Sequence, residues 1–253
     1  MTQSNQQSNQ QKYYDEHYSI SAEEAWKTWQ PNSVLSSKEI SEFSINSNAQ
    51  ETVLAVISGF APFKSTLDIG CSAGDFLIPI SKSSVNSYGV DIVDFSIAWE
   101  TLKNQYHNIH CQKLNLDESN LPFNDSSFDL VTMLMVLEHV FDVHHAIKEV
   151  SRVLSPDGFA VIQVPNIACI THRFDLLIGN LPCTSNTEKK DNKTEWDGQH
   201  LHYFTLSSLN NLLNQHGLQV QKILCSGKLN ILRSFWTSLF GSDLIVLARK
   251  TSD

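Results

Sequence analysis

Short apolar runs alternate with helix-like segments through the middle of the chain. The runs TLDIG, SYGVDI, NIHCQKL, FDLVTMLMV and FAVIQVP, between Thr66 and Pro165, predict five strands. The segments between them predict helices, at Gly74–Lys82, Phe95–Tyr106 and Phe141–Leu154. Strands that are apolar throughout and joined by helices build a parallel sheet that is covered on both faces. The pattern therefore predicts an α/β fold.

Regular patterning lapses after Pro165 and resumes at Thr205. Thr205 is the expected N-cap of a helix that runs to His216 and is closed by Gly217. Two more apolar runs follow, LQVQKILC and DLIVLARK, and we expect them to pair as an antiparallel edge. The complete prediction is a seven-stranded, mostly parallel sheet with helices on both faces and an antiparallel edge strand.

The same patterning divides the chain into regions. Residues 1–11, MTQSNQQSNQQ, have the composition of a disordered polar tail and resemble no secretory signal. Residues 12–60 form a predicted N-terminal helical arm, in which Ile45–Gly59 has one apolar helical face. Residues 61–253 form the predicted main domain, and its polar segment 166–204 is expected to be an insertion or lid, since long loops in compact domains are often functional.

Composition narrows the class of protein. The 253 residues include 18 Lys and Arg against 27 Asp and Glu, a net charge of −9, which disfavours binding to nucleic acid. The longest apolar stretch, Leu130–Leu137, is too short to span a membrane. The five cysteines are scattered without a CxxC pair, which is typical of reduced thiols. We therefore expect a soluble cytoplasmic protein.

The stretch LDIGCSAGDF, Leu67–Phe76, carries the first chemical signal. A strand leads through a loop containing Gly70 and Gly74 into a helix, whose unpaired N–H groups suit a carboxylate or phosphate. Nicotinamide-dependent reductases use a similar loop with the spacing GxGxxG. The spacing here is GxxxG, which disfavours a pyrophosphate site.

Further signals follow in order along the chain. Asp91 ends the run GVDI about 20 residues after the glycine loop, where an acid can accept both hydroxyls of a ribose. Taken alone, Asp91 has an ordinary interpretation as a turn or helix-cap residue. The runs LNLDESNLPF and FDLVTMLMVLEHV follow, and SPDGFAVIQVPN comes later.

In this order and spacing, the five motifs resemble those of class I S-adenosylmethionine (SAM)-dependent methyltransferases over roughly residues 45–250. LEHV and the later HLHYFTLSSLNNLLNQHG are similar to the ubiquinone-biosynthesis O-methyltransferase and methionine-biosynthesis-W-like branch. The resemblance implies a Rossmann-like fold, SAM as the cofactor and S-adenosylhomocysteine as its product.

The resemblance also implies roles for residues around the methionine part of SAM. The loop around this moiety is implied to comprise Asp68, Gly70, Cys71 and Gly74, with backbone groups of Gly70 and Cys71 facing the cofactor. Leu134, after the fourth predicted strand, is implied to offer its carbonyl oxygen to the cofactor amine.

Other residues are implied to hold the nucleoside. Asp91 would bind the ribose diol, and Ile92 would pack on the adenine ring. Asp117 would accept from the adenine amino group, with the Leu116 backbone nearby. From the N-terminal arm, a tyrosine is a candidate to close over the cofactor, Tyr14 or its neighbour Tyr18; the alternative is an exposed aromatic arm.

His139 is the candidate general base for a hydroxyl acceptor, because it follows the fourth strand at the sheet edge where ligands bind. Glu138 is the candidate group to orient it. The alternatives are a helix-capping histidine and a carboxylate bonded to the backbone. In the ubiquinone branch a metal-binding pattern has a Glu three residues before the Glu-His pair, where this chain has Met135. No third ligand is fixed by spacing, so we expect no metal.

The segment 166–204 contributes candidate acceptor-binding residues, Trp196, His200, His202 and Tyr203. The alternative is a plain surface insertion. The predicted function is transfer of a methyl group to an O or N atom of a small-molecule acceptor. A D/N-P-P-Y/F/W tetrapeptide, typical of nucleobase N-methylation, is absent after the fourth strand. A non-catalytic SAM-binding partner protein is the alternative function. The sequence predicts neither the acceptor's identity nor an oligomeric state.

Overall fold

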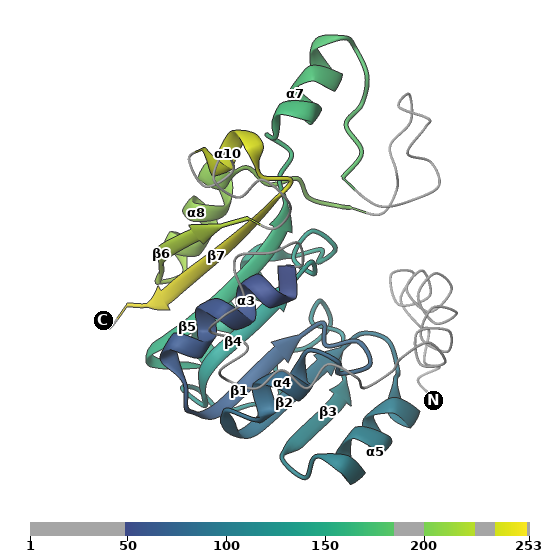
Figure 1. Ribbon diagram of the computed structural model, residues 1–253, viewed down its shortest axis with the longest axis vertical. Coiled ribbons are helices and arrows are strands. Elements are labelled where there is room, and N and C mark those ends of the chain that lie inside the picture. The colour runs from purple at the N-terminus through teal and green to yellow at the C-terminus, as the bar shows by residue number, and fades with distance from the viewer. Residues whose placement is uncertain (1–48, 185–199, 226–235, 252–253) are drawn as a thin grey trace, which may run out of the picture.

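The computed structural model of the chain describes residues 49–184, 200–225 and 236–251 (Figure 1). Its strands form one seven-stranded sheet in the order β3-β2-β1-β4-β5-β7-β6. The strand bounds are β1 Phe63–Ile69, β2 Ser84–Asp91, β3 Ile109–Lys113, β4 Phe128–Leu134, β5 Leu154–Pro165, β6 Leu218–Leu224 and β7 Asp243–Lys250.

The helices connect and cover these strands. Their bounds are α3 Ala49–Ile57, α4 Leu77–Ser81, α5 Ser96–Gln105, α6 Val143–Val153, α7 Ile170–Leu177, α8 Leu206–Gln215 and α10 Thr237–Phe240, with a 3₁₀ turn at Ser58–Phe60. None of the helices in the described ranges is long and apolar enough to cross a membrane.

The sheet confirms the predicted topology. Strands β1 to β5 are parallel to one another, while β7 runs antiparallel to both β5 and β6. The expected antiparallel edge is therefore present, and its reversed strand β7 lies one position in from edge strand β6. Because β1 to β5 point the same way, their carboxyl ends gather at one edge of the sheet.

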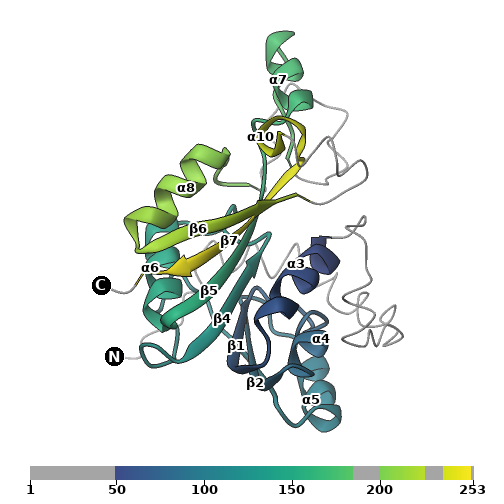
Figure 2. The same ribbon diagram turned by 60° about the vertical axis from the view of Figure 1, so that its left-hand side comes forward.

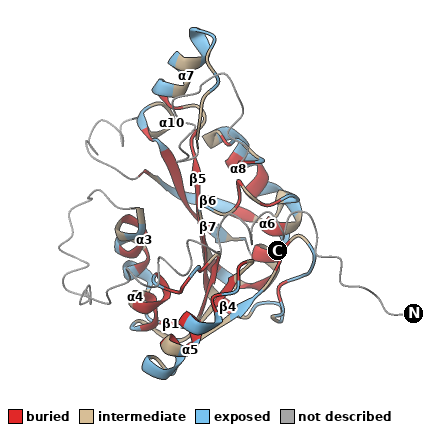
Figure 3. Cartoon of the chain, turned by 90° about the vertical axis from the view of Figure 1, so that its right-hand side faces the viewer, coloured by how far each residue is buried: buried red, intermediate tan, exposed pale blue. Residues whose placement is uncertain are grey.

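Helices cover both faces of the sheet, α6 and α8 on one side and α3 and α4 on the other (Figure 2). One core cluster joins residues such as Ile147 of α6 and Leu209 of α8 to Leu67 and Met133 in the strands. A second joins Val53 of α3 to strand residues on the opposite face. The buried residues therefore form two layers on either side of the strands (Figure 3).

Three element ends differ from the sequence prediction for local reasons. Helix α4 begins at Leu77 rather than Gly74, because Ser72 and Gly74 have φ of 49° and 94° and form turns. Strand β4 ends at Leu134, because Met135 has a φ of 58°. Strand β5 begins earlier than expected, at Leu154, with an irregular register opposite β4.

The predicted N-cap of α8 is confirmed. The Thr205 side chain accepts from the Ser208 N–H, and the Ser208 hydroxyl accepts from the Thr205 N–H, so the pair forms a capping box. Gly217 follows with a φ of 72°, a backbone conformation that favours glycine and ends the helix.

Much of the predicted N-terminal region lies outside the described residues, including the tail 1–11 and residues 12–48 of the arm. The described end of that arm, α3, packs its Val53 side chain into the sheet. Of the predicted lid 166–204, residues 166–184 and 200–204 are described, and they include α7, which projects beyond the carboxyl end of the sheet (Figure 1).

Candidate functional site

A cavity of about 310 Å³ opens at the carboxyl ends of the parallel strands. This volume is at the lower end of the range for small-molecule sites. The lining residues come from the ends of β1, β2 and β4 and from the loops after β1, β2, β3 and β4. They are Ile69, Gly70, Ser72, Val90, Asp91, Ile92, Val93, Phe95, Leu114, Asn115, Leu116, Asp117, Leu134, Met135, Val136, His139 and Val140.

Gly70 is required where the chain leaves β1. Its φ is 80°, and a side chain there would collide with Val136, which lines the same cavity. The Gly70 and Cys71 N–H groups both donate to the Val90 carbonyl of β2, over 2.8 and 3.1 Å. The loop is thus held close to the second strand, with its backbone at the cavity wall.

Asp91, at the end of β2, ties the glycine loop to its own loop. Its carboxylate accepts from the Ser72 N–H at 2.8 Å and from the Val93 N–H at 2.9 Å. Burial raises the pKa of Asp91, and these backbone bonds act against that shift. Asp91 lines the cavity with its carboxylate already oriented by the two loops.

Asp68 and Cys71 lie behind the loop and do not line the cavity. The Thr132 hydroxyl donates to the buried Asp68 carboxyl at 2.6 Å. Desolvation raises the pKa of Asp68 to about 7, the Thr132 bond lowers it in part, and the nearby charge of Asp91 raises it further. Hydrogen bonding to Cys111, together with burial, raises the pKa of the Cys71 thiol. Gly74 is likewise outside the lining, with a φ of 94° that directs the chain into α4.

The loop after β3 brings three predicted positions together. The Asp117 carboxylate accepts from the Phe141 N–H at 2.9 Å and from the Asp142 N–H at 3.0 Å, which fixes the start of α6. The Asn115 side-chain oxygen accepts from the Asp117 N–H, while its buried amide nitrogen has no hydrogen-bond partner among the described residues. Asn115, Leu116 and Asp117 all line the cavity.

The end of β4 also contributes residues to the cavity wall. Leu134 lines the cavity and is followed by Met135, whose N–H donates to the Gln163 carbonyl at 2.9 Å. The loop then brings His139 to the cavity. The His139 N–H donates to the Val136 carbonyl at 2.9 Å, which holds this turn.

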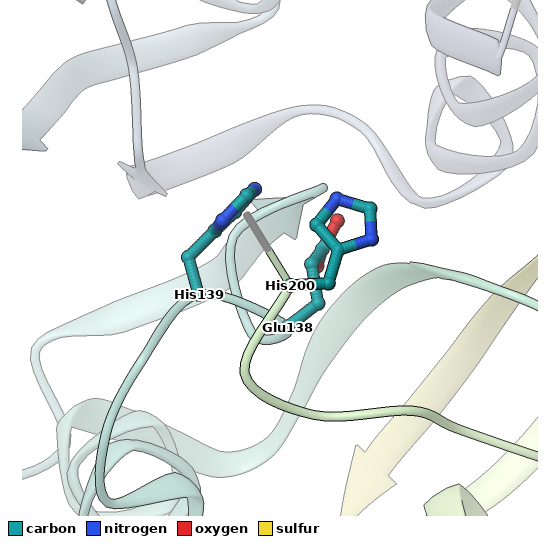
Figure 4. Close-up of side chains that lie close together, drawn as sticks. All are labelled: Glu138, His139 and His200. Atoms are coloured by element: carbon teal, nitrogen blue, oxygen red, sulfur yellow. The ribbon is translucent and has the colours of Figure 1, made fainter. Parts of the chain in front are cut away.

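Glu138 does not line the cavity, and its carboxylate lies near His200. Its side chain is fully buried, and desolvation raises its pKa to about 8. His200 is also buried, and its ring stands nearly perpendicular to that of His139, with ring centres 4.8 Å apart (Figure 4). The fold therefore joins Glu138, His139 and His200 into one cluster beside the cavity.

The other described acceptor candidates, His202 and Tyr203, do not line the cavity. His202 contacts the Phe141 carbonyl oxygen at 3.2 Å, and Tyr203 is 42% exposed. Tyr14 and Trp196 lie outside the described residues. Sequence reasoning missed Ser72 and Asn115 as site residues. Both stand inside the motifs that it singled out, and only the fold shows that they face the cavity.

Comparison with known proteins places these features in a family. A family model described as "Methyltransferase domain" matches residues 45–223, which is more than half of the chain. This range includes every described residue that lines the cavity.

Curated relatives match a smaller part. A demethylmenaquinone methyltransferase of Staphylococcus haemolyticus is 41% identical over 101 residues, which are 38% of this chain and 41% of the relative. A 2-phytyl-1,4-naphtoquinone methyltransferase of Trichormus variabilis is 33% identical over 110 residues, 42% of this chain and 48% of the relative. The match thus spans less than half the length of these two relatives.

Among solved structures, the chain is similar to the 1,6-didemethyltoxoflavin-N1-methyltransferase of Burkholderia thailandensis with bound 1,6-didemethyltoxoflavin and S-adenosylhomocysteine. The TM-score is 0.59 at 16% identity, over 96% of this chain and 87% of that one. This likeness confirms the predicted Rossmann-like methyltransferase fold.

Proposed function

Since the chain belongs to the methyltransferase-domain family, we propose that it transfers the methyl group of SAM to an oxygen or nitrogen atom of a small-molecule acceptor and releases S-adenosylhomocysteine. The observation that carries the proposal is the joint between Ser72 and Asp91 at the cavity wall. It brings a backbone-lined glycine turn and an oriented carboxylate to one cavity, the two features that a nucleoside with an amino-acid tail requires.

The proposed cofactor seat follows the cavity lining. The methionine tail lies against Gly70, and the Leu134 carbonyl receives its amine. Asp91 accepts from the ribose hydroxyls. Asp68, Cys71 and Gly74 form the rest of the loop and shape it from behind, in keeping with their absence from the lining.

The adenine ring lies between Ile92 and the loop after β3. Asp117 accepts from the adenine amino group beside the Leu116 backbone, in addition to the backbone bonds that its carboxylate accepts at the start of α6. We add Asn115 to the set, because its buried amide nitrogen has no partner among the described residues and suits a ring nitrogen of adenine.

The chemistry of transfer belongs largely to SAM, whose sulfonium makes the methyl carbon electrophilic. The protein has to hold the acceptor atom in line with that methyl group and exclude water, and orientation of this kind supplies up to about 7–11 kcal/mol. An acceptor hydroxyl must also lose its proton. His139 is the titratable group at the acceptor end of the cavity, beside Glu138 and His200, so this step falls to that cluster.

We propose an aromatic hydroxyl compound as the acceptor. The names of the two curated relatives refer to quinones. A quinone is a flat ring whose carbonyl groups become hydroxyl groups on reduction. We also propose that the chain belongs to the ubiquinone-biosynthesis branch. A cytoplasmic location is part of the same proposal and rests on the scattered cysteines.

Calorimetric titration with SAM, S-adenosylhomocysteine and NADH tests the cofactor assignment. We expect the two sulfur nucleosides to bind and NADH to give no heat of binding. Binding of NADH without binding of either sulfur nucleoside would contradict the proposal and favour a nicotinamide-dependent reductase.

Transfer of labelled methyl from SAM to a panel of catechols, hydroquinones and aromatic amines tests the activity. We expect product with at least one hydroxyl acceptor. Tight SAM binding without transfer to any member would favour the non-catalytic SAM-binding alternative.

A further inference from the structure

Glu138, His139 and His200 form a cluster with the chemistry of a metal site. One potential ligand atom from each, a carboxylate oxygen and two ring nitrogens, lies within 4.8 Å of the others. Figure 4 shows the two imidazole rings and the carboxylate converging from two segments of the chain. Glu138 and His139 come from the loop after β4, and His200 comes from the lid.

The buried carboxyl group of Glu138 is the main evidence for a bound cation. It is fully buried, and neither of its carboxyl oxygens has a hydrogen-bond partner among the described residues. Burying a carboxyl group with both oxygens unsatisfied costs several kcal/mol of folding free energy in either protonation state. A cation bound at the cluster offsets this cost, because it gives the carboxylate both a charge and a ligand.

The backbone holds the two segments together. The N–H groups of Leu201 and His202 both donate to the Glu138 carbonyl, over 2.9 and 3.1 Å. These bonds fix the lid segment beside the loop after β4, so the approach of His200 to Glu138 is built into the main chain rather than left to side-chain rotation.

The His200 ring is oriented by a second contact. Its Nδ1 lies 2.6 Å from the Thr184 hydroxyl. Histidines that bind metals regularly engage a neighbouring group through the other ring nitrogen, which fixes the tautomer and the ring plane. Thr184 provides this kind of support here.

We propose that Glu138, His139 and His200 bind one divalent transition-metal ion, of the zinc, cobalt or manganese type, at the acceptor end of the cofactor cavity. Two imidazoles and one carboxylate are the donor set of open zinc sites, which keep a fourth position for water or substrate. Donor atoms in such a site lie roughly 3.4 Å apart, so the cluster contracts by about 1 Å when the ion binds.

The sequence pointed away from this site, because Met135 stands where the branch pattern has a Glu. The fold provides His200 as the third ligand instead, and spacing along the chain does not show that residue beside the Glu-His pair.

The role of the ion rests on the proposed function. His139 lines the cavity, so the open position faces the acceptor. An acceptor hydroxyl bound to the ion loses its proton to water more readily, because the ion stabilises the resulting oxyanion. The oxygen then attacks the methyl carbon, and the carbon–sulfur bond breaks with its electron pair remaining on sulfur. The products are the methyl ether, neutral S-adenosylhomocysteine and one proton.

Metal titration of the untagged, chelator-treated full chain, after removal of the chelator, tests the site directly. We expect one Zn²⁺ or Co²⁺ to bind per chain, Co²⁺ with visible d–d absorption, and Mg²⁺ to bind far more weakly. Glu138→Gln and His200→Ala should each weaken Zn²⁺ binding by at least about tenfold, and Thr184→Val by about 10- to 100-fold.

His144→Ala is the matched control, because His144 forms another histidine pair, with His216 at 3.1 Å, outside the cluster. It should bind Zn²⁺ as the unchanged protein does. Equal binding by all variants, or loss only in His144→Ala, would overturn the site. Should Glu138→Gln fail to fold, judged by circular dichroism, His200→Ala and Thr184→Val decide the question.

Titration of the same samples with S-adenosylhomocysteine separates this inference from the proposed function. If the unchanged protein binds zinc and does not bind S-adenosylhomocysteine, the proposed methyl transfer is wrong and the metal site stands. If the unchanged protein binds S-adenosylhomocysteine and does not bind zinc, the metal site is wrong and the proposed function stands.

Discussion

The Ser72 N–H donates a hydrogen bond to the Asp91 carboxylate over 2.8 Å, and this bond joins the loops after the first two strands. Both residues line the cavity. A carboxylate that is already held by backbone donors meets a ribose without losing side-chain freedom, so the cost of ordering it is met by the fold. The same bond makes Asp91 a sensitive point for cofactor affinity.

Asp91→Ala should weaken S-adenosylhomocysteine binding by about 10- to 150-fold, the equivalent of losing hydrogen bonds of about 1.5–3 kcal/mol to a charged group. Isothermal titration measures the change. Asp94→Asn is the control, because Asp94 accepts from the nearby Ser96 N–H and does not line the cavity. Equal affinity of Asp91→Ala and the unchanged protein would contradict the ribose assignment.

Gly70→Ala should destabilise the fold by about 2–4 kcal/mol, since it combines a positive φ with a collision against Val136. Thermal unfolding should show a fall of roughly 5–15 °C. The double variant Gly70→Ala/Val136→Ala should recover only part of the loss, because it removes the collision and keeps the backbone strain.

Gly59→Ala is the comparison for this prediction. No heavy atom lies within 4 Å of an added side chain there, and its φ is not positive. Its melting temperature should be unchanged or slightly higher. If Gly70→Ala is as stable as Gly59→Ala, the loop after β1 accommodates the added methyl group and the prediction is wrong.

Local patterns predicted the sheet well, because the apolar runs that define its strands are made of residues close together in the chain. Three of the predicted cofactor-binding residues, Gly70, Asp91 and Leu134, stand at strand ends and line the cavity. Sequence alone did not separate the lining residue Gly70 from the buried Asp68, because both belong to one motif and only the fold shows that the Asp68 carboxyl is buried outside the cavity lining.

The proximity of Glu138 and His200 could not be predicted from local patterns. It depends on two backbone bonds from the lid to the Glu138 carbonyl, and no periodicity or motif spacing reports such a long-range contact. The unsatisfied amide of Asn115 was hidden for the same reason, since burial and lack of a partner are properties of the packed structure.

Asp68 should make stability depend on pH. Its pKa is raised from 3.8 to about 7 by burial, so the neutral form stabilises the fold below about pH 4, and this contribution is lost as the pH rises through 7. Asp68→Asn keeps a partner for Thr132 without a titrating group. Its unfolding free energy should therefore fall less than that of the unchanged protein between pH 4 and 7, by about 4 kcal/mol at most.

Urea unfolding at several pH values measures this difference. Arg152 lowers the pKa of Glu149 and gives a slope of the opposite sign, but it does so in both proteins and cancels. Parallel pH profiles for the two proteins would show that Asp68 is ionised in the folded state at pH 4.

Arg152→Lys should destabilise the protein by about 1.5–3 kcal/mol. The guanidinium binds both oxygens of the buried Glu149 at 2.7 Å and donates to the Leu121 and Phe123 carbonyls, and an ammonium group cannot reproduce this planar set. Chemical unfolding measures the loss.

Arg249→Lys is the matched control for Arg152→Lys. Arg249 forms a half-exposed ion pair with Asp157 at 3.1 Å and lies over the Phe159 ring, and its replacement should change stability by less than about 1 kcal/mol. Equal effects of the two substitutions would show that the geometry of the Arg152 network contributes little.

His139→Ala should lower turnover by about 10²-fold or more while S-adenosylhomocysteine affinity stays within about twofold. The expected separation arises because His139 lines the cavity and is proposed to act on the acceptor, while other lining residues are proposed to hold the nucleoside. Labelled methyl transfer gives the rate, and calorimetry gives the affinity. His144→Ala, which removes a histidine of α6 outside the cavity lining, should keep both values. If His139→Ala turns over as fast as His144→Ala, acceptor deprotonation does not depend on the cluster.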